Sequence, residues 1–139
     1  TQLIKTGAFD VMQIQYNLMF QHPYDPDKRG GVMFEAEEQE MGIAIMRPFT
    51  GGVFPRWLKL VYPDIEKCID MDKLMAGLLK LVLSNPVTDV AIVGMREVEL
   101  VEKNCAISDD IEARFDLDPL YGRFLRKRPD SDEEIWIAL

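Results

Sequence analysis

Glycine and arginine residues in two separate segments have the chemistry needed to bind a phosphate group. Gly51 and Gly52 carry no side chain, so the backbone there can approach a diphosphate closely. Gly94 precedes a segment that we expect to be helical, and the unpaired N–H groups at a helix N-terminus attract anions. Arg96 would add a planar, charged guanidinium in the first turn of that helix. These residue types indicate anion binding, although none is specific alone.

Two glutamines, Gln13 and Gln15, lie in an otherwise apolar segment that is typical of a strand buried on both faces. A polar side chain inside such a strand requires a hydrogen-bonding partner. For Gln13 that partner could be backbone, which would make it a structural residue, or a bound ligand. The same alternatives apply to Met46, which could belong to the core, and to Arg96 and Lys103, which could lie on a solvated helix face.

The candidate residues lie beside segments whose apolar patterns predict alternating strands and helices. Buried strands are predicted at residues 9–15, 43–46 and 89–93. Helices are predicted at residues 32–41, 57–61, 73–83, 97–106 and 108–115. Alternation of this kind predicts an α/β fold with parallel strands and right-handed crossovers.

The ends of these elements narrow the search for a site. In parallel α/β sheets, ligands bind beyond the carboxyl ends of the strands. The informative segments are therefore 13–17, 46–52 and 94–104. Gly42 is expected to end the helix before the second strand, and Asp72 to cap the helix before the third.

Length, charge and cysteine content exclude several classes of protein. The chain has 139 residues, whereas a complete eight-stranded barrel has roughly 250. A net charge of −8 makes nucleic-acid binding unfavourable. No apolar run reaches the roughly eighteen residues of a membrane span and no signal sequence is visible, so we expect a cytoplasmic protein. Cys68 and Cys105 are expected to be reduced thiols, and the Glu-rich run 35–40 lacks the spacing of a calcium loop, so no metal site is predicted.

Three motifs, taken in order, resemble the aldo-keto reductase family. FDVMQIQYNL resembles the sixth strand of its (β/α)8 TIM barrel, and MGIAIMRPFTGG resembles the seventh strand with its loop. VLSNPVTDVAIVGMREVELVEKN resembles the helix before the eighth strand, that strand and the helix after it. The resemblance implies a partial barrel of three parallel βα units in residues 1–115, the C-terminal half of such a barrel. Residues 116–139 are expected to form a C-terminal tail of loop and short helix.

The resemblance also implies cofactor-binding roles at the ends of the first two strands. Gln13 matches a glutamine that bonds the nicotinamide carboxamide. Met46 matches a position whose side chain packs on the nicotinamide ring. The loop that follows the pyrophosphate in the family is matched by Arg47, Pro48, Phe49 and Gly51. The implied cofactor is NADP, with NAD as an alternative.

The end of the third strand matches the adenosine side of the same cofactor. Asn104 matches an asparagine that touches adenine. The segment near the adenosine phosphate is matched by Gly94, Met95 and Arg96. Many family members have Arg or Gln where Leu100 stands, Glu where Lys103 stands, and Lys where Gly94 stands. These departures leave the choice between NADP and NAD open, and Arg96 is a candidate substitute for the residue that holds the 2′-phosphate.

The family reduces carbonyl groups with a hydride from the cofactor and a proton from a tyrosine, assisted by Lys, Asp and His. The resemblance places all four in the first half of the barrel, so no catalytic residue is assigned here. Tyr16 and His22 do not match the catalytic tyrosine and histidine. We expect an oxidoreductase portion that is inactive alone. The alternatives are a non-catalytic half-barrel module that at most retains dinucleotide affinity, or a remnant with no function of its own.

An isolated set of three parallel strands has consequences for assembly. Its two open edges present unpaired backbone groups that invite another chain. The side chains that face the barrel interior in a complete barrel would also be exposed. We therefore expect pairing with the missing N-terminal half, or self-association into a homo-oligomer.

Overall fold

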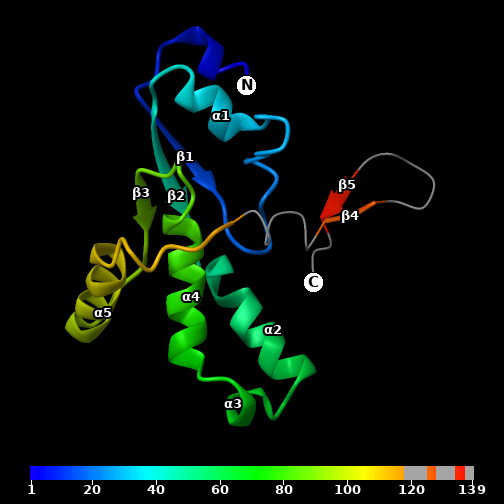
Figure 1. The fold of residues 1–139 in the computed structure, drawn as a ribbon, viewed down its shortest axis with the longest axis vertical. Coiled ribbons are helices and arrows are strands. Elements are labelled where there is room, and N and C mark those ends of the chain that lie inside the picture. Colours follow the sequence, from blue (N-terminus) through cyan, green and yellow to red (C-terminus); the bar gives the residue numbers. More distant parts are fainter. Residues whose placement is uncertain (118–124, 128–133, 137–139) are drawn as a thin grey trace.

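The fold is organised around a parallel sheet of three strands, seen in the computed structural model in Figure 1. The structure describes residues 1–117, 125–127 and 134–136. β1 (Val11–Gln15), β2 (Gly42–Met46) and β3 (Val90–Ile92) lie in the order β1-β2-β3. Both neighbouring pairs are parallel, with Val11 beside Gly42 and Ala44 beside Val90. The predicted α/β class with three parallel strands is therefore confirmed.

The helices lie between the strands in sequence, as the alternating pattern predicts. α1 (Val32–Glu37) separates β1 from β2, and α5 (Val98–Asp109) follows β3. The longer connection from β2 to β3 contains the short 3-10 helix η2 (Thr50–Gly52) and the following helices: α2 (Val53–Val61), α3 (Ile65–Cys68) and α4 (Met71–Leu83). Another 3-10 helix, η1 (Ile4–Thr6), precedes β1.

One face of the sheet forms the core. Ile43 and Ile45 of β2 are buried, and Met12, Ile14 and Ala91 from the neighbouring strands pack on the same side. α1 and the C-terminal turns of α4 contribute the remaining large buried side chains of this core, chiefly Met33, Phe34, Leu81 and Val82. This continuous apolar cluster ties the sheet to the helices.

The other face of the sheet is open, so the prediction of strands buried on both faces is wrong for this chain. Val11 is 62% exposed, Val90 54% and Ile92 44%. Gln13 on the same face is exposed as well. The parallel register places all four side chains on one surface, because alternate residues of a strand face the same way. Covering that surface requires residues other than those that form the core.

Two predicted helix boundaries are wrong for local reasons. α1 ends at Glu37 because Glu40 takes a left-handed conformation (φ 55°) and the Met41 N–H donates to the Ala36 carbonyl at 3.0 Å. Gly42 is the first residue of β2 and does not end the helix. At α4 the cap is Asp70, not Asp72: its Oδ1 accepts hydrogen bonds from the N–H groups of Asp72 (3.0 Å) and Lys73 (3.2 Å).

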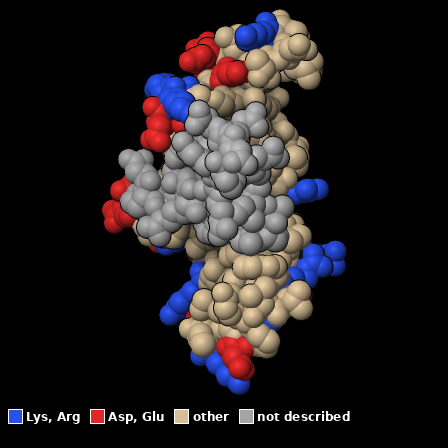
Figure 2. Space-filling view, turned by 90° about the vertical axis from the view of Figure 1, so that its right-hand side faces the viewer, with Lys and Arg blue, Asp and Glu red and all other residues tan. Residues whose placement is uncertain are grey.

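Charged side chains of both signs share the described surface. Figure 2 shows Lys and Arg interspersed with Asp and Glu around the grey atoms. Several form salt bridges, such as Lys59 with Glu66 and Lys67 with Asp64. Exposed pairs of this kind contribute little to stability, typically below about 1 kcal/mol.

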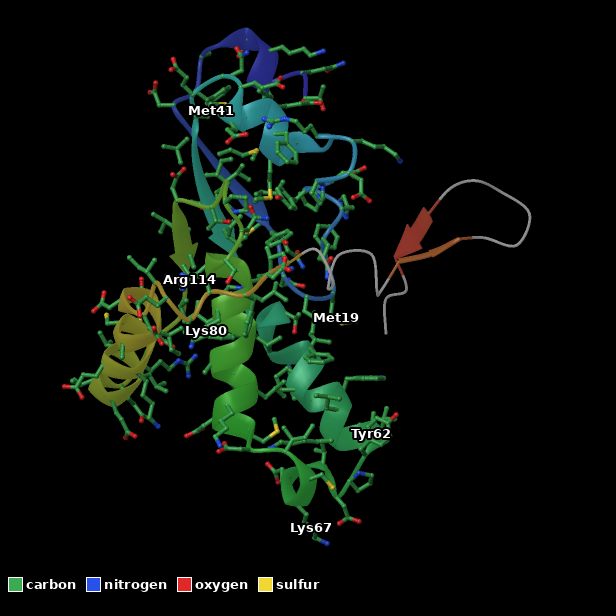
Figure 3. The ribbon with its side chains drawn as sticks, in the orientation of Figure 1. Met19, Met41, Tyr62, Lys67, Lys80 and Arg114 are labelled. Carbon is green, nitrogen blue, oxygen red and sulfur yellow. The ribbon has the colours of Figure 1, made fainter. Side chains whose placement is uncertain are left out.

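The two helices predicted at residues 97–106 and 108–115 are a single helix, α5, followed by turns. Ser108 and Asp109 resemble a helix start in sequence, but they continue the preceding helix. Arg114 folds back on its end, where Nη2 donates to the Ser108 carbonyl at 2.7 Å and Nη1 to the Ile107 carbonyl at 3.4 Å. A cation there satisfies carbonyls that would otherwise lack partners. In Figure 3, Arg114 and Lys80 lie between α4 and this end of α5, where Lys80 pairs with Asp110 at 3.3 Å.

The described part of the tail beyond residue 117 consists of two strands. β4 (Leu125–Lys127) and β5 (Glu134–Trp136) pair antiparallel in a separate sheet of two strands. The short helix predicted in the tail is not found in these segments, and the rest of that prediction lies outside the described residues. Among the described helices, none has the length and apolar character needed to cross a membrane.

Candidate functional site

All three strands of the main sheet end at one edge. The register places Gln15 beside Met46 and Met46 beside Ile92, the last residues of β1, β2 and β3. Loops leaving this carboxyl edge carry most of the residues predicted to bind a ligand. This arrangement is typical of sites in parallel α/β proteins.

A polar cluster joins the ends of β1 and β2. The Gln13 amide Nε2 lies 3.6 Å from the sulfur of Met46. Gln15 Oε1 accepts a hydrogen bond from Arg47 Nη1 at 3.4 Å, and the Asn17 amide Nδ2 donates to the Arg47 carbonyl at 3.0 Å. Of the predicted residues, the structure therefore brings Gln13, Met46 and Arg47 together. Gln15 has the polar partner that its place in an apolar strand requires.

The loop after β2 has an unusual backbone. Arg47 (φ 58°) and Thr50 (φ 55°) are left-handed although neither is glycine, and Gly51 (φ 64°) and Gly52 (φ 76°) follow in the same region. A left-handed residue other than glycine costs about 1–2 kcal/mol and needs support from its surroundings. Backbone strain of this kind is concentrated at functional sites.

Local hydrogen bonds fix the remainder of this loop. Thr50 N–H donates to the Arg47 carbonyl at 2.9 Å, and Thr50 Oγ1 accepts from the Phe54 N–H at 2.9 Å at the start of α2. Pro48 is buried and Phe49 is partly exposed. A Cβ atom added to Gly51 would meet no heavy atom within 4 Å, so open space lies beside this peptide. The glycine is required for its positive φ and leaves room for a ligand.

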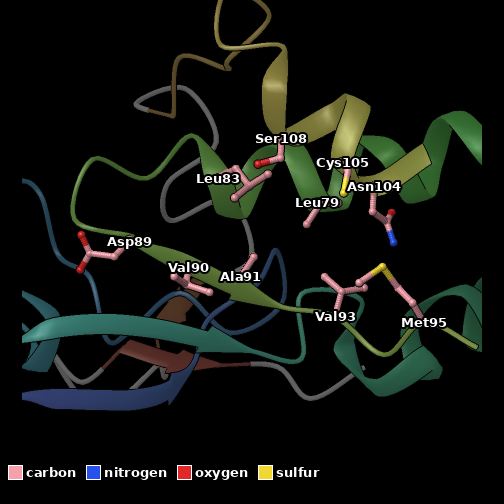
Figure 4. Close-up of a pocket in the computed structure, with 10 residues that line it drawn as sticks. All are labelled: Leu79, Leu83, Asp89, Val90, Ala91, Val93, Met95, Asn104, Cys105 and Ser108. Atoms are coloured by element: carbon pink, nitrogen blue, oxygen red, sulfur yellow. The ribbon is translucent and has the colours of Figure 1, made fainter. Parts of the chain in front are cut away.

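A cavity of about 270 Å³ lies between β3, α4 and α5. Figure 4 shows Asn104 and Cys105 pointing from α5 toward Val93 and Met95. Leu79 and Leu83 of α4 lie beside the α5 residues and make that part of the wall apolar. A mostly apolar space with a few polar groups is typical of small-molecule sites, although this volume lies just below their usual range of about 300–1,000 Å³. Met95 and Asn104, predicted from the third motif, therefore share one cavity.

The expected phosphate site at the start of α5 is not formed as predicted. α5 begins at Val98, so Arg96 precedes the helix and is not in its first turn. Glu97 occupies the N-cap position and Glu99 lies in the first turn, where they bring negative charge to the place that an anion would occupy. Gly94 and Arg96 are exposed, and no hydrogen bond or salt bridge is recorded between Arg96 and another described residue.

The residues that depart from the family pattern also have defined surroundings. Lys103 binds Glu99 at 3.0 Å and Asp72 at 3.3 Å, and these hydrogen bonds and charges raise the pKa of Lys103. Its charge is therefore balanced by two carboxylates. Leu100 is exposed on the same helix and offers no hydrogen-bonding group. Neither residue supplies a free cation for a 2′-phosphate.

Burial changes the acidity of two residues with proton-transfer chemistry, Tyr16 and His22. Burial raises the pKa of Tyr16 to about 12, which makes it a poor proton donor near neutral pH. Burial lowers the pKa of His22, and its ring packs edge-on against Phe20 with centroids 4.1 Å apart.

The most useful residue that the sequence reasoning missed is Asn17. Its amide is the direct link from the loop after β1 to the Arg47 carbonyl. Asn17 lies in segment 13–17 at the end of β1, which the sequence marks as informative, but its contact with Arg47 is tertiary and has no local sequence signal.

Comparisons with protein-family models, with curated proteins and with solved structures found no match for this chain. The aldo-keto reductase family therefore remains a prediction from the three sequence motifs.

Proposed function

We propose that this chain supplies the cofactor-binding, C-terminal portion of an NAD(P)-dependent aldo-keto reductase. The observation that carries the proposal is the meeting of Gln13, Met46 and Arg47 at the carboxyl edge of parallel strands. An amide, a polarisable apolar side chain and a guanidinium there would serve the carboxamide, the ring and the phosphates of one nicotinamide dinucleotide.

The chemistry of the donor set fits most of such a dinucleotide. Gln13 is exposed and its recorded contact is a long one to sulfur, so its amide can bond a nicotinamide carboxamide. Arg47 is exposed and can present its charged fork to a phosphate. Asn104 and Met95 line a cavity that would receive the adenine. A bound dinucleotide would supply the hydride that reduces a carbonyl group to an alcohol.

The proposal requires the remainder of a barrel. A (β/α)8 barrel fills its interior with side chains from all eight strands. Here the equivalent face of three strands exposes Val11, Val90 and Ile92. We therefore propose that the catalytic groups come from the missing half of the barrel, and that this chain alone binds cofactor without reducing substrate.

The test is a titration of the purified chain with NADPH and with NADH, followed by nucleotide fluorescence. Saturable binding that Gln13→Ala and Arg47→Ala each weaken about tenfold or more would support the proposal. Gln39→Ala is the matched control, because Gln39 is an exposed glutamine after α1, away from the carboxyl edge. Absence of binding by the wild-type chain up to millimolar nucleotide would reject the proposal.

A second candidate function is a non-catalytic half-barrel module that acts in assembly. The open apolar face of the sheet favours it, because exposed apolar surfaces of this kind mark interaction sites. An assembly module would associate with itself or a partner and show no nucleotide binding. The same titration, combined with sedimentation analysis, therefore separates the two candidates.

A further inference from the structure

A residue outside the loop after β2 helps to hold Arg47 in its left-handed conformation. Its carbonyl oxygen accepts two hydrogen bonds, one from the Thr50 N–H at 2.9 Å and one from the Asn17 amide at 3.0 Å. The bond from Thr50 is local, and Asn17 belongs to the segment after the neighbouring strand. The orientation of the Arg47 peptide (φ 58°) therefore depends on a residue 30 positions away in sequence.

Asn17 is itself rigidly fixed. Its side chain is fully buried, and its N–H and carbonyl pair with the carbonyl and N–H of Phe20 at 3.1 and 3.0 Å. The side-chain oxygen accepts from the Met19 N–H at 3.1 Å, which leaves the amide nitrogen directed at Arg47. Since the bonding groups on every side of Asn17 are engaged, this residue forms a fixed support for the loop after β2.

A second support acts on the Arg47 side chain. Gln15 Oε1 accepts from Arg47 Nη1 at 3.4 Å. β1 and the segment after it thus supply two contacts to the same residue, with Gln15 bonding the guanidinium and Asn17 bonding the peptide carbonyl. Holding an arginine in place reduces the side-chain entropy lost when it binds an anion.

We propose that Asn17 and Gln15 are positioning residues that hold Arg47 as the diphosphate-binding group of this site. The inference rests on the proposed function in that it takes the diphosphate to belong to a nicotinamide dinucleotide. It goes beyond that function by assigning positioning roles to Gln15, which is partly buried in β1, and to Asn17, which is buried just after β1. Both residues act on anion binding through Arg47.

The test is a double-mutant cycle on binding, with inorganic pyrophosphate and NADPH as the two probes. Arg47→Ala should weaken pyrophosphate binding roughly 10- to 100-fold, the range for a lost charge-assisted contact. Asn17→Ala and Gln15→Ala should each weaken it about three- to tenfold in the wild-type background. In the Arg47→Ala background neither change should weaken binding further, because both residues act by orienting the guanidinium, which this background lacks.

A purely structural role gives a different result. If Asn17 and Gln15 only stabilise the fold, their effects on affinity persist in the Arg47→Ala background, and the inference is overturned. Asn85→Ala is the matched control: Asn85 is buried and its Oδ1 accepts an equivalent bond from the Val87 N–H at 3.0 Å, but Asn85 does not bond Arg47. This variant should lose stability without losing pyrophosphate affinity.

Folding failure does not remove the test. Asn17→Ser keeps a side-chain oxygen that can accept from the Met19 N–H, loses the amide donor to Arg47 and adds no charge, so it replaces Asn17→Ala if that variant is unfolded. Gln15 is only partly buried, and the Gln15→Ala cycle is measured in every case. Additive effects of Gln15→Ala and Arg47→Ala alone overturn the inference.

The two probes separate this inference from the proposed function. The first outcome is non-additive effects of the variants on pyrophosphate affinity, with NADPH bound no more tightly than pyrophosphate. This result supports the inference and rejects the nicotinamide function. Tight NADPH binding with additive effects supports the function and overturns the inference. Wild-type chain that binds neither probe at millimolar concentration rejects both.

Discussion

The carboxylate of Asp89 accepts a hydrogen bond from the backbone N–H of Ile43 at 2.7 Å, while the Asp89 N–H donates to the Ile43 carbonyl at 3.1 Å. Asp89 thereby extends the contact between β2 and β3 beyond the amino end of β3, whose first residue is Val90. The pairing of β2 with β3 includes only three residues on each strand, so this extra pair of bonds is a substantial part of their connection.

Replacing Asp89 by alanine should therefore destabilise the protein. The Ile43 N–H would lose a charge-assisted partner at the edge of the core, and we expect the free energy of unfolding to fall by about 1–2 kcal/mol. Urea denaturation followed by tryptophan fluorescence measures this change. Asp27→Ala removes an exposed carboxylate in the loop before α1 and should leave the midpoint unchanged. Equal midpoints for Asp89→Ala and wild type would show that the bond contributes nothing.

The two faces of the sheet should respond differently to the same substitution. Ile45 is fully buried in the core, and Ile45→Ala should cost about 2–5 kcal/mol through lost burial and a residual cavity. Ile92 is 44% exposed on the open face, and Ile92→Ala should cost less than about 1 kcal/mol. Thermal or urea unfolding of the two variants, at a concentration where the chain is monomeric, gives the comparison. Similar losses would mean that the open face is covered in solution.

The sequence predicts the sheet well because its signals are local. Apolar runs bounded by Gly, Pro and Asn locate all three strands to within two residues, and the intervening helices dictate a parallel arrangement. The sequence does not predict how many faces of the sheet are covered, because an apolar run such as Val90–Ile92 has the same pattern whether one or both faces are buried. That depends on what packs against the sheet and not on the strand itself.

The candidate site was predictable only where it lies next to a strand end. Gln13 and Met46 are placed by the strands that contain them, and Gln13 Nε2 lies 3.6 Å from the Met46 sulfur. The left-handed peptide of Arg47 depends on a tertiary contact with Asn17, which no local pattern encodes. The start of α5 was predicted to within one residue, but the Glu97 N-cap makes no side-chain capping bond, and Arg96 lies before the helix.

The open sheet face should cause self-association of the isolated chain. Val11 and Ile92 lie on that face with more than two fifths of each side chain exposed, and a second copy could bury them. We expect a dimer or larger species at tens of micromolar by sedimentation velocity. Ile92→Lys should shift the population toward monomer because it places a charge in the apolar contact. Leu60→Lys on α2 is the control, since Leu60 is exposed away from the sheet, and a wild-type monomer would contradict the prediction.

Arg96 should distinguish the two nicotinamide cofactors if it holds the 2′-phosphate. It is exposed just before α5 and has no recorded ion pair with another described residue, whereas Lys103 is occupied by Glu99 and Asp72. Arg96→Ala should then weaken NADPH binding roughly tenfold or more and leave NADH binding nearly unchanged. Parallel fluorescence titrations measure both affinities. Equal weakening of the two would assign Arg96 a role unrelated to the 2′-phosphate.

Stability should fall at alkaline pH through Tyr16. Burial raises its pKa from 10.0 to about 12, so the folded protein retains the phenol proton at pH values where the unfolded chain releases it. The folded state then binds more protons than the unfolded state, and linkage requires stability to decrease as pH rises from about 10 to about 12. Below pH 10 this contribution is complete.

Tyr16→Phe tests this linkage because it keeps the ring and removes the titrating group. The variant should lose less stability than wild type between pH 9 and pH 11, the range around the ordinary pKa of tyrosine, when urea midpoints are compared. Tyr62→Phe, in which the altered ring is exposed at the end of α2, should follow the wild-type pH dependence. If Tyr16→Phe and wild type lose stability in parallel, the Tyr16 phenol must be able to ionise in the folded protein. Its surroundings would then be more open to water than the 2% exposure of Tyr16 indicates.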